Sequence, residues 1–125
     1  MIRNNYGFET RSRDGLLCVY LYGEIDHHSA VVYGEIDHHS AVALREDLDR
    51  LLWRERPRRF VLNLSRIEFM DSAGLGLLMG RYRLVRELGG VMALTAPNPR
   101  VMKILRLSGM ERFFEICHAP KGEKR

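Results

Sequence analysis

The chain has 125 residues, of which 46% are hydrophobic and 29% are charged, and this composition excludes an intrinsically disordered protein. Its length accommodates one hydrophobic core, and no apolar run approaches the roughly 20 residues needed to span a bilayer. The net charge of +4 is compatible with nucleic-acid binding, but acidic residues interleave with the arginines and no recognition motif accompanies them, so we expect none.

The ends of the chain and its cysteines indicate where the protein works. Residues 1–13 are polar and lack the apolar core of a secretory signal. Cys18 and Cys117 stand far apart without metal-ligand or redox spacing, and we predict that both are buried free thiols. We therefore expect one cytoplasmic domain over residues 1–125, ending in a short basic tail at residues 120–125.

The N-terminal part predicts a β-hairpin that runs into a duplicated segment. Strand-like residues 6–11 and 16–25 flank a turn signal at residues 13–15. The ten residues 22–31 (YGEIDHHSAV) recur unchanged at residues 33–42. Because solenoid arrays need about three or more longer repeats, this is a tandem duplication inside one domain. It is an engineered insertion, a sequence error or a young natural event.

We expect the two copies to adopt different structures. The first copy completes the strand, because the second copy in that place would put histidines in mid-strand and exchange the two faces. The second copy leads into an amphipathic helix from Ser40 that ends at Pro57, since leucines recur there at helical spacing. The surplus, about residues 29–39, is expected to form a loop with partial helix. A backward extension of the helix is the alternative, which Gly34 and Asp37 disfavour.

The rest of the chain alternates between strands and helices. Residues 59–64 (RFVLNL) are almost continuously apolar, which predicts a strand buried on both faces. The later elements are a helix from Asp71-Ser72 to Leu88, a strand at 91–95, a short helix opened by Asn98-Pro99, and a strand at 113–117. The order predicts an α/β domain with a small mixed, mostly parallel sheet, begun by an antiparallel hairpin and flanked by helices.

Ser72 is a candidate phosphoacceptor. In such sheets sites lie at the carboxyl ends of strands, and Ser72 lies where a strand-to-helix loop meets a helix. The first backbone N–H groups of a helix lack partners and its dipole is positive there, so an added phosphate would be tolerated or stabilised. Gly74 and Gly76 leave room for another protein's active site. A plain helix-capping serine is the alternative.

Other chemistries are less well supported by the residues. The adjacent histidine pairs (27–28 and 38–39) do not place two imidazoles on one helix face, so we expect no metal site. Ser72 as a hydrolase nucleophile would use a histidine as base and an aspartate as orienter (Asp26, Asp37 or Asp71). However, the serine lacks the Gly-x-Ser-x-Gly elbow and an oxyanion loop. We therefore expect no catalytic activity.

Five motifs in order carry a resemblance to a known family. They are GEIDHHSA, which occurs at residues 23–30 and again at 34–41, then 61–64 (VLNL), 69–76 (FMDSAGLG), 80–82 (GRY) and 107–110 (LSGM). Together they resemble the stage II sporulation protein AA group of anti-sigma factor antagonists, which carry the STAS fold. The resemblance covers about residues 7–116, which is nearly all of the chain.

The resemblance implies a phosphorylation switch. Ser72 corresponds to the serine that is phosphorylated by a serine kinase, which is also the anti-sigma factor. The unphosphorylated antagonist binds that kinase and frees the sigma factor, and a serine phosphatase resets the phosphorylated form. The kinase holds the nucleotide, so no cofactor is implied, and no oligomeric state follows. An alternative is a STAS interaction module of another relay, linked to stress or to a transporter.

The resemblance also implies a set of partner-binding residues. They are Asp71, Ser72, Ala73, Gly74 and Leu75, bordered by Asp37 and His38 or by their copies Asp26 and His27. Ala73 stands where the family often has a second serine, which leaves one acceptor. Because the duplication falls in the loop expected beside Ser72, we predict that the fold survives and that partner binding is weakened or altered.

Overall fold

The computed structural model describes residues 6–23, 34–36 and 38–118. Their elements in chain order are β1 (Tyr6–Arg13), β2 (Leu16–Gly23), β3 (Gly34–Ile36), α1 (His38–Glu55), β4 (Arg59–Met70), α2 (Ser72–Glu87), β5 (Val91–Thr95), α3 (Pro99–Leu107), the 3-10 helix η1 (Met110–Phe113) and β6 (Glu115–Cys117). In this part of the chain, no helix combines the length and the apolarity needed to cross a membrane.

The strands form one mixed sheet in the order β1-β2-β4-β5-β6, with β3 paired to the far end of β4. Only β1 and β2 pair antiparallel, and the other described pairs are parallel. The turn between β1 and β2 has positive φ at Asp14 and Gly15, as tight hairpin turns require. The predicted mixed sheet, begun by a hairpin and flanked by helices, is therefore confirmed.

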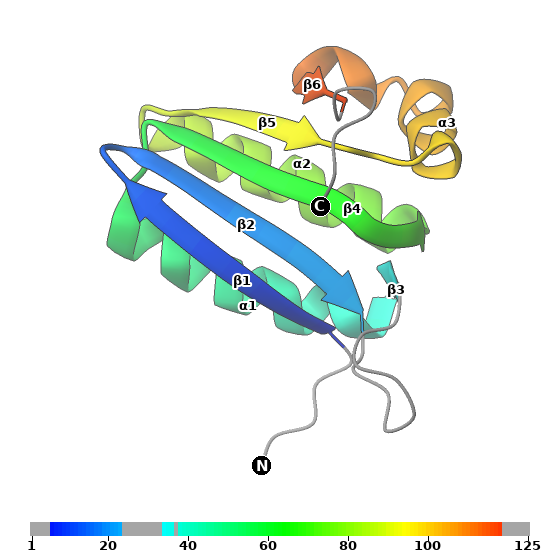
Figure 1. Ribbon diagram of the computed structural model, residues 1–125, viewed down its shortest axis with the longest axis horizontal. Helices are drawn as coiled ribbons and strands as arrows, with labels where there is room; N and C mark the ends of the chain where they lie inside the picture. Colours follow the sequence, from blue (N-terminus) through cyan, green and yellow to red (C-terminus); the bar gives the residue numbers. More distant parts are fainter. Residues whose placement is uncertain (1–5, 24–33, 37, 119–125) are drawn as a thin grey trace.

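Both long helices cover the same face of the sheet (Figure 1). From β3 to β4 to β5 the chain always moves in one direction across the sheet, and right-handed crossovers then put α1 and α2 on one side. The main buried side chains beneath them are Leu17, Val19 and Leu21 of β2, Phe60, Leu62 and Leu64 of β4, and Leu44, Leu48, Leu52 and Leu78 of the helices. This layer is the hydrophobic core.

Among the described residues, no helix covers the other face of the sheet (Figure 1), and two predictions fail there. On β4, Val61 and Asn63 are only half-buried, so the strand is not buried on both faces. Cys18 is half-buried and Cys117 is exposed, so the thiols are not both buried. An apolar run along a strand does not by itself reveal how many layers pack against the sheet.

The duplicated segment also differs from its prediction. Residues Gly34–Ile36 of the second copy form β3 and pair with β4 at Ile67–Met70, and α1 begins at His38 rather than Ser40. Tyr22 of β2 pairs with Arg66 of β4, and Gly34 of β3 pairs with the next residue of β4, Ile67. The second copy therefore continues along β4 from the place where β2 stops. The prediction of a loop with partial helix at 29–39 is wrong for residues 34–36, which form a strand, and agrees with the helix at residues 38 and 39; residues 29–33 and 37 lie outside the described part.

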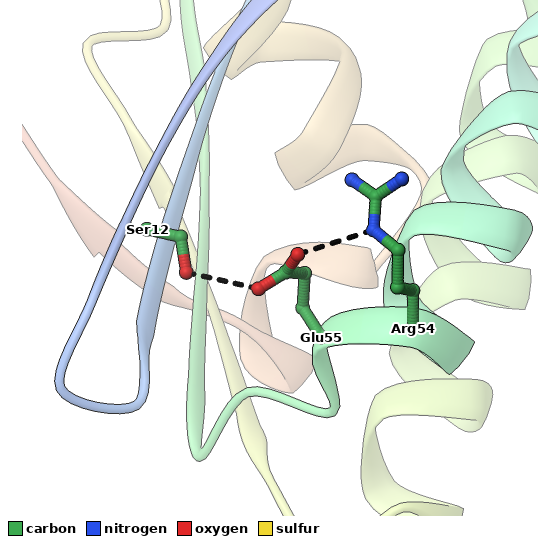
Figure 2. A network of polar contacts seen from close by, with 3 residues as sticks. All are labelled: Ser12, Arg54 and Glu55. Atoms are coloured by element: carbon green, nitrogen blue, oxygen red, sulfur yellow. Dashed lines mark hydrogen bonds and ion pairs between the residues drawn. The ribbon is translucent and has the colours of Figure 1, made fainter.

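Two polar contacts tie α1 to its neighbours. Glu55 at the end of α1 accepts a hydrogen bond from Ser12 Oγ on β1 (3.1 Å) and pairs with Arg54 Nε (3.2 Å), as Figure 2 shows. These exposed contacts contribute little to stability. The second contact lies between the helices, where Arg81 of α2 is buried and its Nε lies 2.8 Å from Asp49 Oδ1 of α1. Burial lowers the pKa of Arg81, and the Asp49 carboxylate opposes this effect.

Candidate functional site

Asp71 and Ser72 lie at the corner where β4 ends and α2 begins, and buried residues precede and follow them in the chain. Met70, at the end of β4, is fully buried, and Gly74 on the first turn of α2 is buried as well. Between them Asp71 and Ser72 are exposed. The chain thus presents two polar side chains to solvent from a backbone that is held on either side.

Asp71, and not Ser72, caps the helix. Its Oδ1 accepts hydrogen bonds from the N–H groups of Ala73 (2.9 Å) and Gly74 (3.2 Å). Ser72 is the first residue of α2, and among the described residues its hydroxyl has no hydrogen-bond partner. The alternative of a helix-capping serine is therefore wrong, because the preceding aspartate holds that place. The serine hydroxyl remains free to react.

The cap changes the electrostatics expected at Ser72. Two of the N–H groups at the start of α2 already bond to the Asp71 side chain, and the N–H of Leu75 bonds to the Asp71 carbonyl at 3.1 Å. Only the N–H of Ser72 itself remains at the first turn of α2 without a partner among the described residues. A phosphate on Ser72 would therefore meet a carboxylate beside it and few free donors, so the helix start would neutralise little of its charge.

The second copy of the repeat reaches this corner. Ile36 pairs with Met70, the residue before Asp71, and α1 begins two residues later at His38. Of the four predicted bordering residues, the backbone of His38 is thus brought near the end of β4. Asp26, His27 and Asp37 lie outside the described residues.

The residues that follow Ser72 on α2 differ in how exposed they are. Ala73 and Leu75 are half-buried and pack against the core, whereas Gly76 is exposed. A Cβ atom added at Gly76 or Gly80 would meet nothing within 4 Å, so the packing of the fold does not require glycine at either place. Gly74, which we expected to form part of the contact surface, is buried beneath these residues.

Sequence reasoning missed one residue near the site. Asn98 was predicted only to open α3, yet its side-chain amide also donates to the carbonyl groups of Ile67 and Glu68 on β4. The helix-capping pattern of Asn98-Pro99 was readable from neighbouring residues. The contact with β4 was not, because it joins residues about thirty positions apart in the chain.

The fold and this corner together define a STAS domain. The model of the STAS domain family matches residues 30–121, and the chain belongs to this family. The match includes all of the second copy of the repeat.

Relatives of the chain carry names that are more specific than the name of the family. The anti-sigma F factor antagonist of Paenibacillus polymyxa is 38% identical over 112 residues, which are 90% of this chain and 86% of that protein. The anti-sigma-B factor antagonist of Bacillus subtilis (strain 168) is 31% identical over 118 residues, covering 94% of this chain and 96% of that protein. A solved structure of the anti-sigma factor antagonist SpoIIAA in its unphosphorylated form is similar with a TM-score of 0.67 and 25% identity, covering 92% and 90% of the two chains. These findings confirm the resemblance carried by the five motifs.

Proposed function

We propose that the chain is an anti-sigma factor antagonist that binds an anti-sigma serine kinase while Ser72 is unphosphorylated. In doing so it frees a sigma factor, and phosphorylation of Ser72 ends the interaction. The observation that carries the proposal is the free, exposed hydroxyl of Ser72 beside its capping neighbour Asp71. The names of the relatives support the same role.

The switch would act through charge at the contact surface. A phosphoserine carries about −1.5 to −2 charges at neutral pH. The Asp71 carboxylate already uses the nearest backbone donors, so this charge would remain largely uncompensated in a docked complex. The partner would then be repelled, and the desolvated phosphate would be costly. Within residues 6–23, 34–36 and 38–118, no hydrogen bond is given up when the hydroxyl of Ser72 is modified.

The proposed contact surface is the first turn of α2 and what borders it. It comprises Asp71, Ser72, Ala73 and Leu75, with Gly74 beneath them, and it continues to the start of α1. We assign the bordering role to Asp37 and His38 of the second copy rather than to Asp26 and His27, because Ile36 pairs with Met70. The kinase supplies the nucleotide, a serine phosphatase reverses the reaction, and this chain contributes binding rather than catalysis.

The decisive experiment measures the intact mass of the protein after incubation with ATP and a sporulation-type anti-sigma kinase. The wild type should gain one phosphate, and Ser72→Ala should gain none. Ser65→Ala is the matched control, since Ser65 is another exposed serine and lies on β4, the strand that leads to Ser72. A wild-type protein without phosphate, or a phosphate retained by Ser72→Ala, would refute the proposal.

A further inference from the structure

The end of β4 that leads to Ser72 extends beyond its neighbour β5. On that side β4 pairs with β5 only from Arg59 to Asn63, and β5 ends at Thr95. The remaining residues of β4 continue to Met70, and β3 pairs with Ile67, Phe69 and Met70 from the other side. The register of β3 skips Glu68, so the strand is irregular just before the site. On this side, residues 64–70 of β4 have no described strand as a partner.

The side chain of Asn98 binds the end of β4. Its Nδ2 donates to the carbonyl of Ile67 and to the carbonyl of Glu68, both at 3.2 Å. Its Oδ1 accepts from the N–H of Val101 at 2.7 Å and thereby caps α3. The amide nitrogen and the amide oxygen are thus both engaged. One side chain joins the irregular end of β4 to the start of α3.

The chain around Asn98 is constrained to aim it at β4. Ala96 adopts a left-handed conformation (φ 55°), which is unfavourable for a residue with a Cβ, and its N–H bonds to the carbonyl of Cys117 at 2.7 Å. Pro97 is buried, and Pro99 occupies the first turn of α3. Two prolines and a strained alanine leave the backbone at Asn98 little freedom. The orientation of its amide is therefore set before any partner binds.

We propose that Asn98 is a positioning residue for Ser72. By holding the carbonyls of Ile67 and Glu68, it sets the direction in which the chain leaves the sheet at Asp71 and Ser72. Without it those carbonyls lose the donor that Asn98 supplies, and the exit of β4 is held only by its pairing with β3 and by its buried side chains Ile67 and Met70. This inference rests on the proposed function, since it assigns to Asn98 the presentation of Ser72 to the kinase.

The test separates the two tasks of Asn98. In Asn98→Asp a carboxylate oxygen still caps α3, but both donors to β4 are lost; Asn98→Ser does the same without adding a charge. Asn63→Asp is the matched control, because Asn63 lies on β4 and its Oδ1 likewise accepts a backbone N–H, that of Ser65 at 2.9 Å. All variants are measured well below their unfolding temperatures.

Two readouts are taken on each protein. In kinase assays on Ser72, both Asn98 variants should lose at least tenfold in kcat/KM, with kcat lowered, while Asn63→Asp stays within twofold of the wild type. Amide hydrogen exchange should accelerate at least tenfold at residues 67–72 in the Asn98 variants alone. Wild-type phosphorylation kinetics in Asn98→Ser would overturn the inference.

The two readouts also separate this inference from the proposed function. If the kinase does not phosphorylate the wild type, the proposed function fails, and hydrogen exchange alone then decides whether Asn98 orders the end of β4. Unchanged exchange at residues 67–72 in both Asn98 variants would refute the positioning role. A lower unfolding temperature with unchanged exchange and unchanged kinetics would mean that Asn98 is only structural.

Discussion

The neighbouring residues Asp71 and Ser72 divide two tasks at the start of α2. The aspartate satisfies the backbone N–H groups of Ala73 and Gly74, and the serine keeps an uncommitted hydroxyl. If the serine itself capped the helix, a phosphate would replace a stabilising hydrogen bond. With the cap one residue earlier, modification changes the charge of the surface and leaves the helix start intact.

The cap predicts a stability effect at Asp71. Asp71→Ala should lower the free energy of unfolding by about 1 kcal/mol, because two N–H groups lose their acceptor. Asp71→Asn is the control, since an asparagine caps about as well. Urea denaturation monitored by circular dichroism measures both. If the alanine variant is as stable as the asparagine variant, the cap contributes nothing.

The free hydroxyl predicts a different pattern at Ser72. Ser72→Glu should lower kinase affinity at least tenfold by calorimetric titration, because it adds a negative charge beside Asp71. Its free energy of unfolding should change by less than about 0.5 kcal/mol, as for exposed substitutions in general. Ser72→Ala should bind like the wild type. Equal affinities of the glutamate and alanine variants would exclude a charge switch.

Within α2, Gly76 and Gly80 carry a cost in helix stability that packing does not explain. A glycine inside a helix is less stable than alanine by about 0.8–1.0 kcal/mol, and the surroundings of Gly76 are open. We predict that Gly76→Ala raises the free energy of unfolding by about 0.5–1 kcal/mol and weakens kinase binding, because the added methyl group lies directly after Leu75, at the edge of the proposed contact surface.

Gly90 provides the contrasting control. A Cβ atom there would lie 2.5 Å from the carbonyl oxygen of Pro57, so Gly90→Ala should destabilise the fold. Thermal unfolding compares the two variants. A Gly76→Ala protein that is more stable and binds the kinase unchanged would show that the contact surface does not extend to Gly76.

Between α1 and α2, the Asp49–Arg81 pair predicts a large effect of a single deletion. Asp49→Ala would leave the buried Arg81 guanidinium without its carboxylate, and we expect a loss of about 2–3 kcal/mol. The value lies below the usual cost of breaking a fully buried pair, since the Asp49 side chain is 35% exposed. Arg50→Ala, which breaks an exposed pair with Asp47, should cost less than about 0.5 kcal/mol. Equal losses in urea denaturation would contradict this reading of Arg81.

At the scale of the whole molecule, the duplication lengthens one connection without moving the sheet. Tyr22 and Gly34 pair with the consecutive residues Arg66 and Ile67, so deletion of residues 23–33 would join β2 to β3 in the existing register. The product has the same sequence as deletion of residues 32–42, because the copies are identical.

The shortened protein should be more stable than the full chain. Removing a connection of this length spares loop-closure entropy, and we expect a gain of about 1–3 kcal/mol in the free energy of unfolding. Kinase affinity should also change, since the duplication borders the proposed contact surface. A less stable deletion variant would show that the extra residues contribute to the fold, and an unchanged affinity would show that they do not affect docking.

The amino-acid sequence by itself determined the parts of this protein that depend on near neighbours. The Asp14-Gly15 turn, the start of α2 at Asp71-Ser72, the opening of α3 at Asn98 and the strand at Val91–Thr95 all follow from residues a few positions apart. Each has a local physical cause: a positive φ, a capping side chain or a pattern of apolar residues. The motif around Ser72 was readable for the same reason.

Only the tertiary structure decided which copy of the repeat pairs with the last residues of β4, which face of the sheet is covered, and what Asn98 holds. The two copies have the same residues and therefore the same local preferences, so the choice depends on pairing with Ile67–Met70 far along the chain. The open face depends on the side to which the crossovers turn, and the Asn98 contacts depend on where β5 ends. The free energies that decide these three features come from contacts between distant segments, so the sequence of one segment alone does not predict them.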